Sequence, residues 1–252
     1  MRPVELAFQL IELLSLHQPV GVSELARLAG IPKSTVQRSL MALHKTGWIE
    51  LADADRPVWS LSMRALVASG RANYEHSVLR GIAIPVMEEL RRESEETVHL
   101  TYRFERSLVL LERLDGIKPV RYFFPYGAVS PLHATSSGRA ILSMMPQDEL
   151  DAYLSQPLDA VTSLTVVDPE IVRSELAEAR ERGYAVTFGG NRSDVHAVGA
   201  AIVDRHAQPF AAISISAPAE RLDASLAERY GPLVADAARR VTLGVTSQPH
   251  FH

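Results

Sequence analysis

The stretch from residue 22 to residue 47 constrains the fold more than any other, because it holds two short helical segments separated by a glycine and a proline. Leu25 lies on the apolar face of the first segment, and Ser23 is a candidate N-terminal cap. Gly30 can adopt the left-handed backbone conformation that ends a helix. Pro32 has the fixed φ angle that favours the first turn of the next helix. The pattern predicts two helices joined by a tight turn.

The second helix of this pair has one apolar face and ends at Gly47. Its apolar residues recur at i, i+4 and i+7, namely Val36, Leu40 and Leu43. Two short helices joined by a glycine-containing turn are typical of a helix-turn-helix, whose second helix enters the major groove of DNA. We therefore expect the second helix to be a recognition helix.

The polar face of this second helix has the side chains that DNA contacts require. Between Ile31 and Trp48 the sequence has three Lys/Arg and no Asp/Glu, although the whole chain has a formal net charge of -4. Lysines, hydroxyls and a helix N-terminus suit phosphate groups, whereas an amide or a guanidinium can bind base edges. The candidate DNA-contacting residues of this helix are Lys33, Ser34, Thr35, Gln37, Arg38 and Lys45, with Gln37 and Arg38 assigned to base edges. The alternative is a solvated face in an ordinary pair of helices.

The segments on either side of the helix pair complete a small domain over residues 1–61. Residues 3–17 have a wide apolar face, which predicts a helix that covers the pair. Residues 48–61 contain two short apolar runs around a polar turn, which predicts a β-hairpin, or wing. Arg56 at the wing tip is a candidate contact to phosphate or the minor groove, and a solvated turn arginine is the alternative. Residues 1–60 contain six Lys/Arg and six Asp/Glu, so positive charge acts there through its placement.

Composition and motifs exclude several classes of function. The chain has 252 residues, no cysteine and a pI near 6.1, so disulfide and thiolate chemistry are excluded and any basic surface is local. No run approaches the ~20 apolar residues of a membrane helix, and the N-terminus lacks the pattern of a secretion signal, so a cytoplasmic protein is expected. There is no nucleophile elbow, zinc spacing or phosphate-binding loop. We therefore predict no catalytic residue, no metal and no cofactor.

The rest of the chain predicts a linker and a mixed α/β domain. Residues 62–79 have a weak helical pattern, which predicts a linker helix. Residues 80–246 alternate helices with short strands and end in a meander, which predicts an antiparallel sheet with helices against it, and 247–252 form a tail. The expected helices are residues 80–96, 132–145, 146–156, 168–183 and 221–243, and the expected strands are 97–104, 107–113, 120–124, 184–188, 197–204 and 210–216. The predicted fold class is α+β.

Three segments of this second domain carry a resemblance to a known family. They are LHATSSGRAIL at residues 132–142, RGYAVTF at 182–188 and AAISISAP at 211–218. Together with the winged helix and the linker before them, they resemble the IclR family of bacterial transcription regulators over nearly the whole chain. The resemblance implies a GAF-like C-terminal domain that binds a small organic acid as its effector. It also implies homodimers or homotetramers that bind double-stranded operator DNA, without a membrane partner.

The resemblance places the effector site in two of these segments. In such regulators, backbone N–H groups after the His-Ala-Thr turn hold the carboxylate of the effector, and the matching residues are Ser136 and Ser137. Small residues allow close approach and a helix N-terminus favours an anion, but an ordinary capped helix without a ligand is the alternative. Ser214 and Ser216 alternate with isoleucines, so both hydroxyls lie on one face of a strand. Family members use these positions for the anion, whereas serines pairing within a sheet are the alternative.

Two effector-binding positions depart from the family pattern. Thr187 stands where an acidic residue is common, and Ala197 stands where a cysteine is common. Both changes shorten the side chain or remove its polar group, so we hypothesise a pocket for a larger or more apolar acid, such as an aromatic one. Leu132 is the remaining candidate effector-binding residue. The apolar walls of the pocket could come from Phe123, Phe124, Tyr126 and Leu132, with ordinary core packing as the alternative.

The sequence leaves two residue roles and two other functions open. His133 either orients the loop or is a satisfied structural histidine, and Arg139 either adds positive potential or is simply exposed. The predicted function is a DNA-binding regulator whose operator affinity depends on the effector. The alternatives are a small-molecule-binding adaptor without DNA binding and a hydrolase. Two-fold pairing through the N-terminal helix and the linker would bring two recognition helices to successive major grooves, about 34 Å apart.

Overall fold

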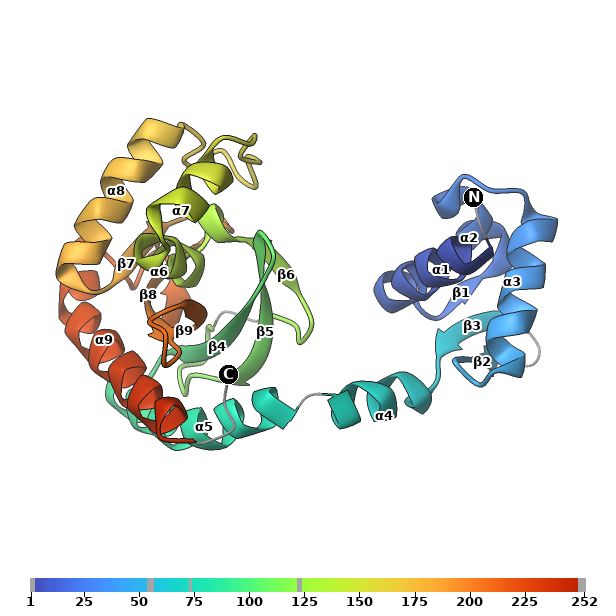
Figure 1. Ribbon diagram of the computed structural model, residues 1–252, viewed down its shortest axis with the longest axis horizontal. Coiled ribbons are helices and arrows are strands. Elements are labelled where there is room, and N and C mark those ends of the chain that lie inside the picture. Colours follow the sequence, from blue (N-terminus) through green and yellow to red (C-terminus); the bar gives the residue numbers. More distant parts are fainter. Residues whose placement is uncertain (1–2, 54–56, 73, 122–123, 249–252) are drawn as a thin grey trace. The chain divides into compact units, whose positions relative to one another are not determined.

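The computed structural model describes residues 3–53, 57–72, 74–121 and 124–248. The chain forms two compact units, Met1–Tyr74 and Glu75–His252 (Figure 1). Each unit has its own hydrophobic core, as expected for a domain.

The first unit is a helix-turn-helix followed by a hairpin. Its elements are α1 (Pro3–His17), β1 (Val20–Gly21), α2 (Val22–Ala29), α3 (Lys33–Lys45), β2 (Ile49–Asp53), β3 (Val58–Leu61) and α4 (Met63–Ala72). The three strands form an antiparallel sheet in the order β1-β3-β2. The predicted N-terminal helix, helix pair and wing are therefore present.

The core of this unit consists of the apolar faces that the sequence predicts. Its fully buried side chains include Leu10, Leu14, Leu25, Val36 and Leu40. Gly30 has a φ angle of 66°, the left-handed conformation expected at the end of α2. The predicted cap was wrong, because α2 begins before Ser23, with Gly21 at its N-cap and no side-chain cap. Gly21 also pairs with Val58 in the sheet, so the short strand β1 determines where the helix begins.

Helix α4 is fastened to the end of α3. Ser62 Oγ donates a hydrogen bond to the carbonyl of Gly47, and Arg64 Nη1 donates to the carbonyl of Thr46 at 2.8 Å. A guanidinium at a helix C-terminus satisfies one of the last carbonyls and complements the helix dipole. The start of α4 is therefore linked directly to the C-terminus of α3.

The predicted linker helix over residues 62–79 is not a single element. Helix α4 ends at Ala72, and α5 (Tyr74–Ser94) begins before Arg80, where the sequence predicted the next helix to start. Leu79 is fully buried in the core of the second unit. Tertiary packing thus extends α5 over turns whose local sequence pattern is weak.

The second unit is built on a six-stranded sheet in the order β6-β5-β4-β9-β8-β7 (Figure 1). Its strands are β4 (Thr97–Phe104), β5 (Ser107–Leu114), β6 (Val129–Pro131), β7 (Ala185–Phe188), β8 (Val195–Val203) and β9 (Pro209–Pro218). Every neighbouring pair is antiparallel, so the predicted antiparallel sheet is confirmed.

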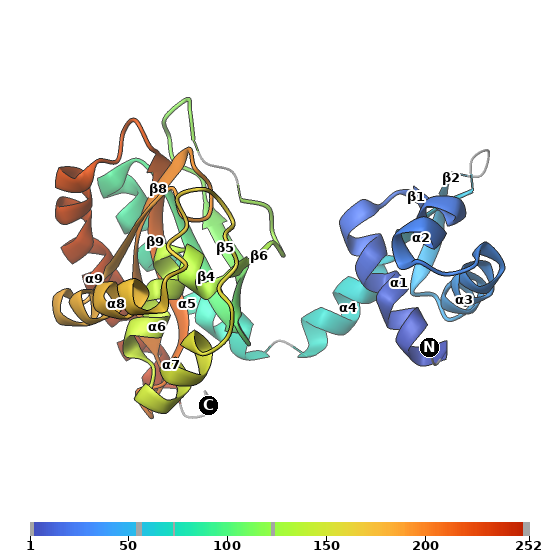
Figure 2. The same ribbon diagram turned by 90° about the horizontal axis from the view of Figure 1, so that it is seen from above.

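Helices cover both faces of this sheet (Figure 1, Figure 2). Helices α5 and α9 (Ala224–Thr246) lie on one face, and η1 (Leu132–Ala134), α6 (Ser136–Met144), α7 (Gln147–Leu154) and α8 (Pro169–Arg182) lie on the other. Strand β9 shows how alternation divides the two layers. Ile213 and Ile215 are fully buried in the core with α5 and α9, so Ser214 and Ser216 lie on the opposite face.

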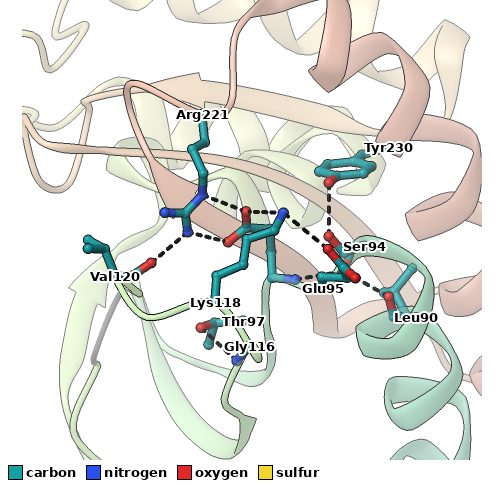
Figure 3. Close-up of polar contacts among 10 residues, drawn as sticks. Leu90, Ser94, Glu95, Thr97, Gly116, Lys118, Val120, Arg221 and Tyr230 are labelled. Carbon is teal, nitrogen blue, oxygen red and sulfur yellow. Dashed lines mark hydrogen bonds and ion pairs between the residues drawn. The ribbon is translucent and has the colours of Figure 1, made fainter.

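The expected strand over residues 120–124 is absent where the structure describes that segment. The carbonyl of Val120 instead accepts a hydrogen bond from Arg221 Nη2 at 2.6 Å, and Lys118 pairs with Glu96 (Figure 3). The side chain of Arg221 thus satisfies a backbone carbonyl that a strand ladder would otherwise use. The strand that pairs with the outer edge of β5 is β6, which the sequence did not predict.

The carboxylate of Glu96 binds both Arg221 and Lys118, two residues labelled in Figure 3. Its side chain is 1% exposed, and its carboxylate accepts hydrogen bonds from Arg221 Nε at 2.8 Å and from Lys118 Nζ at 2.9 Å. Burial alone would raise the pKa of Glu96, but the bonds from Arg221 and Lys118 outweigh burial and lower that pKa. The ionised carboxylate thus holds the segment after β5 against the start of β4.

Replacing Glu96 by glutamine is expected to lower the free energy of unfolding at pH 7 by about 3 kcal/mol, because it leaves two cations without their counterion. A carboxylate with a lowered pKa stabilises the fold above its unfolded-state pKa of about 4.5, and this stabilisation is lost as pH falls through the folded-state pKa. The difference between wild type and Glu96→Gln should therefore shrink as pH falls below about 4.5. Urea unfolding followed by circular dichroism between pH 7 and pH 3 measures it.

Glu89→Gln is the matched control, because it breaks an exposed ion pair with Arg240 between α5 and α9. Such a pair contributes little to stability, so this variant should unfold close to wild type at every pH. A stability loss in Glu96→Gln that is equally large at pH 3 and pH 7 would contradict the assigned role of the charge.

Candidate DNA-contacting face and effector cavity

The face of α3 that the sequence assigned to DNA is exposed to solvent. Lys33, Ser34, Gln37, Arg38 and Lys45 are exposed, and Thr35 is half-buried. The opposite face of the helix supplies Val36 and Leu40 to the core. The amphipathic pattern of α3 thus orients the candidate side chains away from the domain, where a DNA groove could receive them.

The first turn of α3 adds a favourable local potential for phosphate. It has no acidic residue, and Pro32 at its N-cap leaves the first N–H groups of the helix unused by a side-chain cap. The remaining DNA-contact candidate, Arg56, lies outside the described residues, as does the candidate pocket residue Phe123.

A cavity of about 520 Å³, its opening to solvent included, lies between the sheet of the second unit and the N-terminus of α6. All six strands contribute to its walls. The strand residues are Ser130, Leu108, His99, Thr101, Ser214, Ser216, Val195, Ala197 and Thr187. The remaining lining residues are Phe124, Thr135, Ser136, Ser137, Asn191 and Arg192. None of the described residues that line it is Asp or Glu.

The N-terminus of α6 lies at this cavity. The side chain of Thr135 caps the helix there, and strand β8 packs closely against its first turn. Thr135 Oγ1 accepts a hydrogen bond from Gly138 N at 2.9 Å, which leaves the N–H groups of Ser136 and Ser137 as the other donors of the first turn. Gly199 of β8 allows this approach, because a Cβ atom there would lie 2.8 Å from Ser137 N. The helix dipole and these two donors favour an anion in the cavity.

His99 forms part of the cavity floor and is uncharged at physiological pH. Burial, followed by the positive charge of Arg113, lowers the pKa of His99 to about 3. Its Nδ1 lies 3.3 Å from Ser216 Oγ, and its ring meets the edge of Phe124 at 6.3 Å between centroids. A neutral imidazole beside hydroxyl groups offers a ligand hydrogen bonds without adding charge.

The structure brings together most of the residues that the sequence assigned to the effector. Six candidates line this one cavity, namely Ser136, Ser137, Thr187, Ala197, Ser214 and Ser216. Leu132 does not line it, because this side chain is fully buried in the core with Leu108 and Ile141. Phe124 lines the cavity, whereas Tyr126 is exposed and bonds to Glu112.

The two open roles beside the His-Ala-Thr turn are structural. His133 is buried and contacts the hydroxyl of Tyr153 at 2.8 Å and the carbonyl of Asp159 at 3.0 Å, as a satisfied structural histidine does. The alternative that Arg139 is simply exposed was wrong, because its side chain is buried and pairs with Glu175. The sequence could not show that the start of α6, between these two residues, is buried.

Several lining residues were missed by the sequence analysis. His99 and Thr101 alternate with apolar residues in β4, so the same period-two argument that selected the serines of β9 would have selected them. Asn191 and Arg192 follow β7 in a turn, where no periodic signal exists. That turn is held by Thr162 Oγ1 and Thr165 Oγ1, which donate to the carbonyls of residues 189 and 190.

A second cavity, of about 960 Å³ with its opening, lies between α8, β7 and the start of α9. Its charged lining residues are Arg139, Arg182, Glu175, Glu178 and Glu228. Arg139 is already neutralised by Glu175. An organic acid there would meet more negative than positive side chains, so this cavity suits the expected effector less well than the cavity at α6.

Two further properties bear on function. Among the described residues, no helix combines the length and apolarity that a membrane span requires. Within the same ranges, no three His, Asp or Glu side chains gather as metal ligands would.

A winged helix-turn-helix followed by an α/β unit with a small-molecule cavity defines a ligand-responsive DNA-binding protein. The model of the bacterial transcriptional regulator IclR C-terminal domain matches residues 72–243, and the model of the IclR helix-turn-helix domain matches residues 3–53. The chain therefore belongs to the IclR family, and it is a DNA-binding transcriptional regulator with a C-terminal effector domain.

Individual relatives agree with this family assignment over nearly the whole chain. The chain is 35% identical to the HTH-type transcriptional regulator KipR of Bacillus subtilis, over 81% of each chain. It is 30% identical to the acetate operon repressor of Salmonella typhimurium, over 89% of this chain and 82% of the relative. The solved structure of an IclR homolog from Microbacterium hydrocarbonoxydans has the same fold, with a TM-score of 0.84, 24% identity and coverage of 98% of this chain and 100% of the homolog.

Proposed function

We propose that the cavity at the N-terminus of α6 binds a small organic acid and that its occupancy changes the affinity of the protein for operator DNA. The observation that carries this proposal is the positive end of α6 facing a hydroxyl-lined cavity without a described acidic side chain. A carboxylate would accept hydrogen bonds from the N–H groups of Ser136 and Ser137 and from the hydroxyls of Ser214 and Ser216. The geometry and the family resemblance support these proposed residue roles.

The walls of the cavity favour an acid with a compact apolar body and a second polar group. Phe124, Leu108 and Val195 supply apolar surface, while Thr101 and Ser130 supply further hydroxyls. The Microbacterium homolog was crystallised with 4-hydroxybenzoate, an acid of this type. Thermal-shift measurements with benzoate, 4-hydroxybenzoate, glyoxylate and a longer aliphatic keto acid would test the preference. Stabilisation by glyoxylate alone would contradict a cavity for aromatic acids.

Replacing Ser214 and Ser216 together by alanine is expected to weaken binding of the stabilising acid by about 10²- to 10⁴-fold, because it removes two hydrogen bonds to a charged group that contribute about 1.5–3 kcal/mol each. Isothermal titration calorimetry with that acid measures the loss. The affinity of the ligand-free protein for DNA should stay unchanged. Ser143→Ala is the matched control, because Ser143 is a buried serine of α6 that bonds to the carbonyl of Ala140 and does not line the cavity. Undiminished binding in the double variant would place the effector elsewhere.

We further propose that a homodimer binds operator DNA, with two α3 helices in successive major grooves about 34 Å apart. One winged helix reads few base pairs, so two-fold pairing would supply specificity. Exposed apolar residues on α1 and α4 give this pairing a surface. They include Val4, Phe8, Met63, Leu66 and Val67. A protein with this function would act in the bacterial cytoplasm and would carry no catalytic residue.

A mobility-shift assay with the intergenic DNA upstream of its own gene tests DNA binding, with salt varied because phosphate contacts make affinity salt-dependent. A retarded band that weakens as salt rises, and that responds to the acid from the thermal-shift panel, is expected. The adaptor alternative predicts no retarded band from folded protein even at low salt.

A further inference from the structure

Glu112 of β5 connects two parts of the second unit that are distant in sequence. Its side chain is 9% exposed, and Oε2 accepts a hydrogen bond from Arg80 Nε of α5 at 3.0 Å. Oε1 accepts a hydrogen bond from the hydroxyl of Tyr126 at 2.6 Å. One carboxylate therefore links helix α5 to the segment between β5 and β6.

The next residue of β5, Arg113, also contacts this segment. Arg113 Nη1 donates to the carbonyl of Phe124 at 2.5 Å, and the guanidinium carbon lies 5.5 Å from the centre of the Tyr126 ring. Phe124 is a wall of the effector cavity and meets the ring of His99 edge-on. The position of this wall thus depends on two consecutive residues of β5.

We infer that Glu112 is a positioning residue that couples the Phe124 wall of the cavity to helix α5 through Tyr126 and Arg80. This inference rests on the proposed function, since it assigns the route by which an occupied cavity acts on the helix that begins this unit. A ligand that moves Phe124 also moves Tyr126, and Glu112 then loses or shifts its bond to Arg80.

The ionised carboxylate of Glu112 couples its two partners, Tyr126 and Arg80. Burial alone would raise the pKa of Glu112, but the hydrogen bonds from Tyr126 and Arg80 outweigh burial, lower that pKa and keep the group ionised. Its two partners hold the carboxylate in one position, so losing either partner frees it to move and weakens its bond to the other. A substitution at Tyr126 should therefore affect helix α5, and a substitution at Arg80 should affect the segment that contains Tyr126.

Hydrogen–deuterium exchange of the full-length protein, without DNA or ligand, tests the link in both directions. Tyr126→Phe removes the hydroxyl bond and should speed amide exchange in the first turns of α5 by about tenfold. Arg80→Ala should speed exchange in residues 126–128 by a similar factor. The double variant should fall short of the product of the two factors, because both substitutions act on Glu112.

The Glu89→Gln variant is the matched control, because it removes an exposed ion pair between α5 and α9 without touching Glu112. It should leave exchange in residues 126–128 at the wild-type rate. The inference is overturned if Tyr126→Phe changes only its own segment, or if the two substitutions act independently. Since this experiment uses neither DNA nor acid, failure to bind either would count against the proposed function and not against the link.

Discussion

An alanine at Gly138 is expected to destabilise the second unit by about 3 kcal/mol or more and to abolish acid binding in the cavity. The added Cβ would lie 2.2 Å from the carbonyl oxygen of Leu132 and 2.4 Å from Leu132 Cα. Both atoms are backbone, so α6 or the turn before it must shift by a large fraction of an ångström. That shift would displace the N–H groups of Ser136 and Ser137, which are the proposed anion donors. Urea unfolding and calorimetric titration with the acid measure the two effects.

Gly81→Ala is the matched control for this substitution. Gly81 lies within α5, and a Cβ atom there meets nothing within 4 Å. Alanine has a higher helix propensity than glycine, so this variant should be unchanged or more stable by up to about 1 kcal/mol. A Gly138→Ala protein with wild-type stability and acid affinity would show that the turn before α6 is not tightly packed.

Replacing Arg38 by alanine is expected to reduce discrimination between the operator and unrelated DNA by about 1–3 kcal/mol for each half-site. The side chain is exposed on α3, and a guanidinium can form two hydrogen bonds with a guanine edge. Gln37→Ala should act in the same way if its amide reads an adenine. Fluorescence anisotropy with operator and scrambled duplexes at one salt concentration measures the ratio of the two affinities.

Lys33→Ala separates base contacts from phosphate contacts. It should weaken binding to both duplexes alike and reduce the slope of log affinity against log salt by about one. Unchanged discrimination in both Gln37→Ala and Arg38→Ala would remove the assignment of base contacts to α3. A selective loss of operator binding in Lys33→Ala would instead give that lysine a base-reading role.

The sequence alone determined those parts of the molecule that depend on local chemistry. Gly30 ends α2 because glycine adopts a positive φ angle without strain, and Pro32 precedes α3 because its ring fixes φ. The apolar period of α3 fixed which side chains face outward. The alternation of serine and isoleucine in β9 fixed which side chains share a face, since that rule needs only one strand. The family motifs then indicated that this face and the start of α6 belong to one site.

Only the tertiary structure decided what those faces meet. The register of β4 against β9 places His99 beside Ser214, and no local pattern encodes a pairing between residues so far apart in the chain. In the irregular segment around Val120, the carbonyl that a strand would have used is bonded by Arg221, far along the sequence. Arg139 is buried because it packs and pairs with Glu175 of α8, which is also distant in the sequence. Long-range contacts of this kind depend on how whole elements pack, so they set the walls of the cavity and the fastening of its Phe124 segment to α5.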